Sequence, residues 1–588
     1  MRDAAPQTIY LADYTPYGFI IDDVALHFDL DPRKTRVKSR ISFRPNPDAS
    51  DKTFFLHGEN LSLVSAMIDG TPVSPEVTPQ GLTCDVPDAP FVWEAEVEID
   101  PMGNTALEGL YMSNGMYCTQ CEAEGFRKIT YYPDRPDVMA VFTVTINGPH
   151  PVLLSNGNPV SSGKDTAEWH DPWPKPAYLF ALVAGDLVAH PGSFTTKSGR
   201  KVDLNLYVRP GDEGKCAFGM QALKDSMKWD EDVYGREYDL DLFNIVAVDD
   251  FNMGAMENKG LNIFNSSAVL ASPETSTDMN FERIEAIIAH EYFHNWTGNR
   301  ITCRDWFQLC LKEGLTVYRD SQFTSDMRSA AVKRIGDVID LRARQFPEDQ
   351  GPLAHPVRPE SFQEINNFYT ATVYEKGAEV IGMLKLLVGD AAYSKALDLY
   401  FDRHDGQACT IEDWLQVFED TTGRDLGQFK RWYSQAGTPQ LSVTESWDHG
   451  TLTLHFKQHT PASAATADPQ PYVMPIAVGL IGQDGDEVHE TTVLEMTQAE
   501  QSFVFDDLGT RPVASVLRGF SAPVVLTQDL SDADRAHLLA HDTDPFNRWE
   551  QGRMLAYGSL LGMIREGKAP NKDWLAGIRA VIGDETLD

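Results

Sequence analysis

The sequence predicts a multidomain α+β protein in which two β-rich regions are separated by a mainly helical one. Its 588 residues suffice for three to five domains at roughly 100–200 residues each. Hydrophobic residues make up 42% and charged residues 23%, which is the balance of a globular chain and argues against disorder. The period of the hydrophobic pattern changes three times along the chain and thereby predicts four domains.

The first domain, residues 1–186, is predicted to be an N-terminal antiparallel β domain. Runs in which apolar and polar residues alternate occur at 25–30, 38–43 and 138–146. Clusters of Pro, Gly, Asn and Asp lie between these runs, as expected of turns between strands.

The second domain, residues 187–437, is predicted to be mainly helical, with a small sheet in its first part. Residues 201–208 still alternate, but the period lengthens to that of amphipathic helices at 217–234 and 281–296. Further helical segments are predicted at 373–387, 391–402 and 411–421.

Two smaller domains follow. Residues 438–530 alternate again, which is typical of a small β-sandwich, and a loop rich in Ala, Thr and Pro interrupts them at 458–471. Residues 531–588 have the period of three short helices, which bury little surface on their own. We therefore expect this last region to be the beginning of a truncated helical domain.

The charge balance excludes some classes of partner. Asp and Glu number 87 against 50 Lys and Arg, so the formal net charge is -37. A surface of this sign repels nucleic acid and anionic membranes, and it is compatible with a cationic ligand.

The cysteine count and the apolar runs favour a cytoplasmic protein. Seven cysteines in 588 residues suit a reducing compartment better than a disulfide framework. No secretory signal is expected at the N-terminus, because Asp13 interrupts the apolar residues early. No segment approaches the ~18 uninterrupted apolar residues of a membrane-spanning helix.

The stretch from His290 to His294 has the pattern H-E-x-x-H within a segment of helical period. Residues four apart are separated by about 400° at 3.6 residues per turn, so both histidines share one helix face, where a single zinc ion can bind both. Glu291 lies beside them and can take a proton from zinc-bound water. The alternative is a helix with two surface histidines.

Zinc catalysis needs a third protein ligand, and Glu313 is the candidate. Eighteen residues separate it from His294. The first helix is expected to end at a left-handed pair, 298–299, and a capping box at 305–308 is expected to open a second helix. Glu313 lies in this second helix, on a face marked as buried by Leu311, Leu315 and Val317. A buried glutamate requires a charge partner, and a metal ion would provide one.

Three further features are less specific. Asp320 shares the face of Glu313 and could orient a ligand histidine, or it could be a solvated helix residue. Residues 251–260 are rich in Gly and Asn and could form an ordinary loop, or they could accept a peptide by strand addition. The pair Cys118 and Cys121 has the C-x-x-C spacing of redox or zinc-knuckle motifs, but no second pair supports that interpretation.

The H-E-x-x-H motif at 290–294, Glu313 and the segment Gly254-Ala-Met-Glu-Asn258 together resemble the gluzincin (M1-type) zinc aminopeptidases. That family includes membrane alanyl aminopeptidase and leukotriene A4 hydrolase, and the likeness is greatest to its bacterial members. It covers essentially the whole chain, and two independent motifs stand in the correct order about thirty residues apart. The resemblance implies a thermolysin-like catalytic domain at 187–437 that binds one Zn2+ per chain.

The resemblance also implies roles for individual residues. His290, His294 and Glu313 would bind zinc, Glu291 would act as the general base, and Tyr374 would stabilise the oxyanion. The substrate's free α-amine and first side chain would contact residues of two segments. The first segment provides Gln120 and Glu122, and the second provides Met253, Gly254, Ala255, Met256, Glu257 and Asn258. In the family the second segment is an edge strand beside the zinc, Glu257 binds the amine, and Met253 lines a pocket that would permit varied side chains.

The expected activity is therefore the removal of N-terminal residues from peptides with a free α-amine, by glutamate-assisted attack of zinc-bound water. Two alternatives remain, an epoxide hydrolase of the leukotriene A4 hydrolase type and a catalytically inactive binding scaffold. The protein is expected to act as a monomer. Because bacterial members carry a long C-terminal helical region, we expect this chain to lack most of it.

Overall fold

A computed structural model describes residues 7–585, in two compact units. The first unit runs to Lys312 and also takes in Ser361–Asn367 and Tyr400–Trp414. The second consists of Glu313–Glu360, Phe368–Leu399 and the chain from Leu415 onward. Within the described residues, no helix is both long and apolar enough to cross a membrane.

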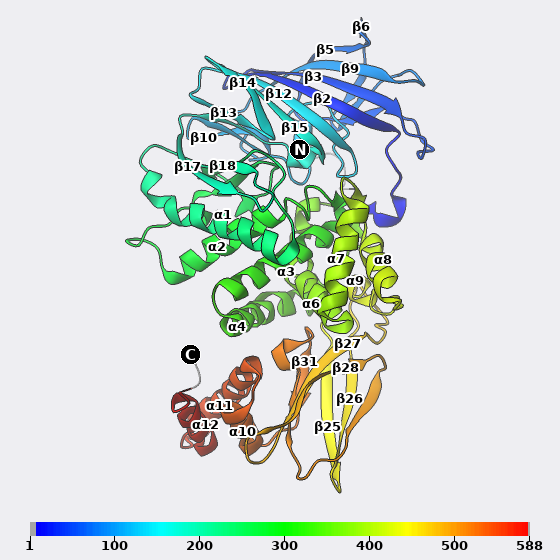
Figure 1. Cartoon of the computed structure of the whole chain (residues 1–588). Helices are drawn as coiled ribbons and strands as arrows, with labels where there is room; N and C mark the ends of the chain where they lie inside the picture. Colours follow the sequence, from blue (N-terminus) through cyan, green and yellow to red (C-terminus); the bar gives the residue numbers. More distant parts are fainter. Residues whose placement is uncertain (1–6, 586–588) are drawn as a thin grey trace. The chain divides into compact units, whose positions relative to one another are not determined.

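An eight-stranded sheet dominates the N-terminal part of the first unit (Figure 1). Its strands in spatial order are β14 (Asn158–Gly163), β15 (Thr166–Pro176), β12 (Met139–Asn147), β2 (Phe19–Asp29), β3 (Thr35–Pro45), β9 (Phe91–Ile99), β5 (Ser62–Ile68) and β6 (Thr71–Pro72). All neighbours pair antiparallel except β12 and β2. Burial alternates residue by residue along β9 and β12, so the predicted β domain forms because one face of each strand is apolar.

Smaller sheets accompany this large one. A four-stranded sheet has the order β10 (Gly109–Ser113), β11 (Met116–Gln120), β16 (Leu182–Gly185) and β13 (Val152–Ser155). A three-stranded sheet contains β4 (Phe55–His57), β8 (Gly81–Thr83) and β7 (Glu76–Thr78). Two isolated pairs are β1 (Ile9–Tyr10) with β23 (Ser361–Phe362) and β22 (Thr302–Cys303) with β24 (Ala408–Cys409).

The sheet predicted for the start of the helical domain has five strands. Their order is β17 (Val188–Thr195), β18 (Lys201–Val208), β19 (Leu242–Val248), β21 (Leu261–Asn265) and β20 (Ala255–Met256). Strand β20 therefore lies at an edge of this sheet, where it pairs antiparallel with β21. The edge position matches the expectation for the Gly254–Asn258 segment.

Helices α1 (Ala217–Trp229) and α2 (Asp278–Phe293) pack against each other. Ring pairs join both ends, with centroids 4.9 Å apart for Phe218 and Phe281 and 5.0 Å apart for Trp229 and Phe293. A π-helical turn, Asp230–Tyr234, continues α1. These contacts fix α2, the helix that contains the H-E-x-x-H motif.

The second unit contains helices and the β-sandwich. Its helical elements are α4 (Ala330–Asp340), π-helical turns at Leu341–Gln345 and Thr372–Lys376, α5 (Phe346–Asp349), α6 (Gly377–Val388) and α9 (Arg431–Ser434). Three α-helices have residues in both units, namely α3 (Leu309–Met327), α7 (Asp390–His404) and α8 (Ile411–Thr422). The β-sandwich has one sheet of β29 (Glu500–Phe505), β26 (Thr451–His459), β25 (Gln440–Asp448) and β31 (Val525–Gln528), and another of β28 (Glu487–Met496), β27 (Met474–Ile481) and β30 (Val513–Val516).

Three helices follow the β-sandwich, as predicted. They are α10 (Asp532–His541), α11 (Pro545–Glu566) and α12 (Lys572–Ile582). Leu538 of α10 is fully buried in a cluster with Ile481 and Val513 of the sandwich. These helices are therefore attached to the sandwich through apolar contacts as well as through the chain.

Candidate functional site

Helix α2 carries both histidines of the predicted metal site. Thr277 caps its N-terminus in a capping box with Asn280. His290 and His294 lie at its other end, with their Nε2 atoms 3.0 Å apart. As the four-residue spacing predicted, the two side chains share one face and direct the same kind of ligand atom to one point.

The His294 ring is held in one orientation by a hydrogen bond to the backbone three residues further along the chain. Its Nδ1 lies 2.8 Å from the carbonyl oxygen of Thr297, which can only accept a hydrogen bond. The proton is therefore on Nδ1, and the lone pair of Nε2 is available to a metal. A Cβ added at Gly298 would lie 2.9 Å from His294 Nδ1, so a glycine is required there by close approach to the imidazole.

The predicted end of the first helix was wrong. Helix α2 ends at Phe293 with His294 as its C-cap, not at 298–299. The chain turns back at once, because the Asn299 amide donates to the His294 carbonyl at 2.9 Å and Gly298 donates to Ile301 at 2.8 Å. Tertiary and loop hydrogen bonds thus ended the helix before its periodic pattern did.

Glu313 lies on α3, one residue after Lys312, and is 2% exposed. Its carboxylate, His290 and His294 each offer one ligand atom, and these atoms lie within 4.8 Å of one another. Two imidazoles and one carboxylate are a donor set that zinc commonly takes in catalytic sites. The residues present therefore fit a zinc ion.

The capping box predicted at the start of this helix is only partly present. The Asp305 side chain accepts from the Phe307 amide at 3.1 Å and caps a short 3-10 turn, Trp306–Gln308, that leads into α3. The Gln308 amide group donates to the Asp305 carboxylate, and its oxygen accepts from Ile411 N at 3.0 Å. Gln308 is thus used in a tertiary contact and does not reach back to the cap backbone.

Lys312 stands between the two carboxylates predicted to bind an amine. Its Nζ is 2.7 Å from Glu122 Oε1 and 2.7 Å from Glu257 Oε1, and all three side chains are at least 96% buried. Glu257 Oε1 is also 4.0 Å from His294 Nδ1. The two glutamates therefore converge on an ammonium group beside His294, one of the two histidines predicted to bind the metal.

Charge arithmetic indicates what this cluster can accept. Two buried carboxylates, those of Glu122 and Glu257, meet the single ammonium of Lys312, and Glu313 offers a further carboxylate oxygen within 4.8 Å of theirs. A cationic group is attracted by this surplus of carboxylates, whereas a neutral group is not. The cluster therefore favours a cationic ligand over a neutral one.

Gln120 and the cysteines next to it have different environments. The Gln120 side chain is 2% exposed, and its Oε1 has no hydrogen-bond partner among the described residues. An orphaned buried carbonyl oxygen is an available acceptor for a ligand N–H. Burial raises the pKa of Cys118 to about 12 and that of Cys121 well above its ordinary value, so both thiols are protonated in this environment.

The segment from Met253 to Asn258 changes from exposed to buried along its length. Gly254 is exposed, and a Cβ added there would meet nothing within 4 Å. Met253 is half-buried, whereas Met256, Glu257 and Asn258 are buried. The exposed part offers open space at the sheet edge, as a bound peptide would require.

Tyr374 lies in the π-helical turn Thr372–Lys376 of the second unit, and π-turns are frequent at functional sites. The turn is fixed at both ends, because Glu348 Oε1 accepts from Thr372 and Asp349 accepts from Lys376 Nζ at 2.6 Å. It continues directly into α6, which begins at Gly377.

Helix α6 approaches α3 closely within the second unit. A Cβ added at Gly314 would lie 2.9 Å from the backbone of Gly377. Gly314 follows Glu313, and Gly377 comes three residues after Tyr374. The segments that carry Tyr374 and Glu313 are therefore neighbours. Asp320 is half-buried two turns further along α3, and its role as an orienter stays a prediction.

Sequence reasoning missed Lys312 and several residues that hold the site together. Lys312 stands directly before Glu313 and close to Leu311 and Leu315, so a cation on a buried helix face was visible in the pattern. Its partners come from distant segments, and no local signal links them. Asn299, whose side-chain amide donates to the Glu257 carbonyl oxygen at 2.9 Å, is predicted from the sequence only as part of a helix end.

Comparison with known proteins identifies the family. Residues 218–433 match the Peptidase family M1 domain, and residues 15–179 match the Peptidase M1 N-terminal domain. Aminopeptidase N of Caulobacter vibrioides is 54% identical over 585 residues, which is 97% of this chain and 67% of that protein. The chain belongs to peptidase family M1. Residues 437–529 and 532–588 match domains of unknown function described as an Ig-like fold and as ARM repeats.

Two further relatives of this M1 chain also match it over almost its whole length. Aminopeptidase N of Escherichia coli is 50% identical over 607 residues, covering 99% of this chain and 70% of that protein. The crystal structure of Legionella pneumophila aminopeptidase A in complex with aspartic acid superposes with a TM-score of 0.90 at 33% identity, covering 99% of this chain and 68% of that one. The predicted family and fold class are confirmed, while the predicted domain boundaries stay a prediction.

Proposed function

We propose that this chain is a zinc-dependent aminopeptidase that removes the N-terminal residue from peptides with a free α-amine. Its membership of peptidase family M1 and the names of its relatives support a metallo-aminopeptidase. The observation that carries the finer proposal is the 4.0 Å between Glu257 Oε1 and His294 Nδ1. An amine anchored this close to the metal ligands leaves only the first peptide bond within reach.

The proposed chemistry divides between the metal and the residues of this chain. A zinc ion held by His290, His294 and Glu313 would act as a Lewis acid and lower the pKa of water at the site. Glu291 takes a proton from the attacking water and passes it to the leaving amine. Tyr374 donates a hydrogen bond to the carbonyl oxygen as negative charge develops on it.

The substrate's ammonium is bound by Glu122 and Glu257, which Lys312 already bridges, and its charge adds to that of Lys312 against the surplus of carboxylates. Gln120 Oε1 accepts an additional hydrogen bond from it. Broad specificity for the first side chain is expected from the half-buried, flexible Met253. We expect the monomer to contain all of these groups, and nothing in this geometry favours epoxide opening or an inactive scaffold.

Blocking the substrate's amine tests the proposal. Aminoacyl-anilides with a free amine should be cleaved, and their N-acetylated forms should lose about 2–5 kcal/mol of binding and transition-state stabilisation, which is roughly 30- to 4,000-fold in kcat/KM. The measurement is a matched panel of free and acetylated substrates with one zinc-loaded preparation. Equal cleavage of both forms would refute the amine anchor.

Substitution Tyr374→Phe should lower kcat while KM changes little, because the hydrogen bond forms chiefly in the transition state. Loss of one oxyanion donor typically costs about 100- to 1,000-fold in kcat. Tyr369→Phe is the matched control, since its ring lies 6.3 Å from that of Tyr374 within the same segment. A rise in KM alone would reassign Tyr374 to ground-state binding, and a larger kcat effect of Tyr369→Phe would transfer the role to that residue.

A further inference from the structure

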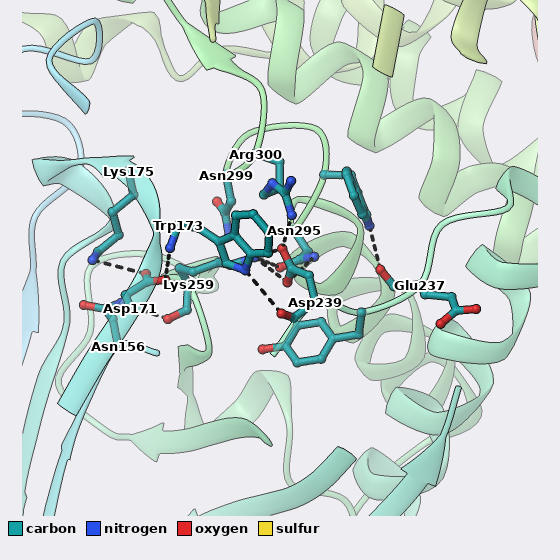
Figure 2. A network of polar contacts seen from close by, with 12 residues as sticks. Asn156, Asp171, Trp173, Lys175, Glu237, Asp239, Lys259, Asn295, Asn299 and Arg300 are labelled. Atoms are coloured by element: carbon teal, nitrogen blue, oxygen red, sulfur yellow. Dashed lines mark hydrogen bonds and ion pairs between the residues drawn. The ribbon is translucent and has the colours of Figure 1, made fainter. Parts of the chain in front are cut away.

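A buried polar network includes Lys259, which is two residues after Glu257, the glutamate proposed to bind the amine. All of this network belongs to the first unit (Figure 2). Asp239 stands at its centre, with Lys259, Arg300 and Asn295 around it. These residues come from three separate stretches of the chain and have no role in the proposed chemistry. They are nevertheless linked, along the chain and through hydrogen bonds, to the segments that contain Glu257 and His294.

Lys259 uses all three N–H donors of its ammonium inside the protein. It donates to Asp239 Oδ1 at 2.6 Å, to Asp239 Oδ2 at 2.7 Å and to Asn295 Oδ1 at 2.7 Å. Its side chain is 1% exposed. A fully bonded, buried ammonium of this kind fixes its own backbone position, two residues after Glu257.

The Asp239 carboxylate accepts hydrogen bonds from two cations, Lys259 and Arg300, and from one side-chain amide, that of Asn295. Arg300 Nη1 donates to its Oδ2 at 2.8 Å, and Asn295 Nδ2 donates to its Oδ1 at 3.2 Å. Burial alone would raise the pKa of Asp239, but the charges and hydrogen bonds of Lys259 and Arg300 outweigh it and hold the pKa below its ordinary value. The Arg300 guanidinium also stacks 3.6 Å from the Trp173 ring centroid.

Taken with its outer members, the network is electrically balanced. Three carboxylates face three cations. Ion pairs join Lys259 to Asp239, Asp239 to Arg300 and Arg300 to Asp405, and the separate pair of Asp171 and Lys175 acts on Lys259 through the charge of Asp171. Every member except Asp405 is at least nine-tenths buried in its side chain. Desolvated charges in such numbers persist only when each has a partner.

The network connects the two halves of the proposed site. On one side, Lys259 and Glu257 belong to the same short segment between β20 and β21, and Asn299 Nδ2 donates to the Glu257 carbonyl oxygen at 2.9 Å. On the other side, Asn295 follows His294 directly at the end of α2. The hydrogen bond from Lys259 to Asn295 therefore connects the segment that contains Glu257 to the residue that follows His294.

We propose that Lys259, Asp239 and Asn299 are positioning residues that hold the Glu257 carboxylate at a fixed separation from His294. This inference rests on the proposed function, because it assigns the network to amine recognition. The metal ligands keep their own support, namely the bond between His294 Nδ1 and Thr297. Disturbing Lys259 consequently affects where the substrate's amine is held more than whether zinc binds.

The test is Lys259→Met, which removes the ammonium but keeps most of the side-chain volume. We expect KM for a free-amine aminoacyl-anilide to rise roughly 10- to 100-fold, as for other residues that orient a site, with kcat less affected and zinc content unchanged. Arg518→Met is the matched control, since the Arg518 side chain is 3% exposed and paired with an aspartate, Asp542, but belongs to the second unit, outside this network. Its KM should stay within about twofold of the parent's.

A double-mutant cycle separates positioning from general destabilisation. In a Glu257→Gln background, Lys259→Met should add less than about threefold to KM, because both changes act on one interaction. Asn299→Ala, which buries no new charge, should give a smaller KM rise that also vanishes in that background. Equal KM effects of Lys259→Met and Arg518→Met, or full additivity with Glu257→Gln, would overturn the inference alone. An unchanged KM in Glu257→Gln would overturn the amine anchor itself and the inference with it.

Discussion

Glu291→Gln should abolish most turnover while the protein still binds zinc. The substitution keeps the size and hydrogen-bonding reach of the side chain but removes the basic carboxylate that accepts the water's proton. General acid–base catalysis typically contributes about 100- to 10,000-fold, and we expect kcat to fall by that amount. Single-turnover rates measured together with metal content by mass spectrometry provide the check.

Glu282→Gln on the same helix is the matched control. It lies nine residues before Glu291, which at about 100° per residue places it on the opposite face of α2. Its turnover should equal that of the parent. A Glu291→Gln variant that keeps near-parent kcat with full zinc occupancy would remove Glu291 from the role of general base.

Removal of the metal should be equally severe. Treatment with a chelator should abolish hydrolysis, and stoichiometric zinc should restore it, because the proposed water activation depends on the ion. His294→Ala should lose both zinc and activity, since it deletes one of three protein ligands. Zinc affinity should fall on acidification, because protons compete with the metal for the same nitrogen and oxygen atoms.

His455→Ala serves as the control for the histidine substitution. His455 is exposed on β26 of the sandwich, and its ring nitrogens form hydrogen bonds with Ser446 and Ser502. Its zinc content and turnover should match those of the parent. Undiminished hydrolysis by the chelated parent protein would contradict a zinc-dependent mechanism altogether.

The parts of the site that local spacing determines could be predicted from the sequence. The shared face of His290 and His294 follows from helix geometry, and the burial of Glu313 follows from its apolar neighbours on the same helix. The alternating strands of the first domain and of the sandwich were likewise predictable, because one-sided burial imposes a period of two. Each of these features depends on residues fewer than ten positions apart.

Features that depend on distant segments could not be predicted in this way. Lys312 meets Glu122 and Glu257 only after a strand end, a sheet edge and a helix have come together. The end of α2 at Phe293 is decided by loop bonds such as that from Asn299 to His294, whereas the hydrophobic pattern continues to Trp296. Sequence periodicity does not record which polar groups become buried neighbours.

The balanced ion pairs around Asp239 carry a consequence for how this protein can vary. Removing one member of a buried pair costs about 3–5 kcal/mol, whereas replacing a whole set with well-packed apolar residues is often neutral. Asp239, Lys259 and Arg300 are therefore expected to show strong epistasis, in which any single exchange is harmful but a concerted exchange is tolerated. Among homologous sequences these three positions should covary as a group, and engineering that alters one of them should begin by replacing all three.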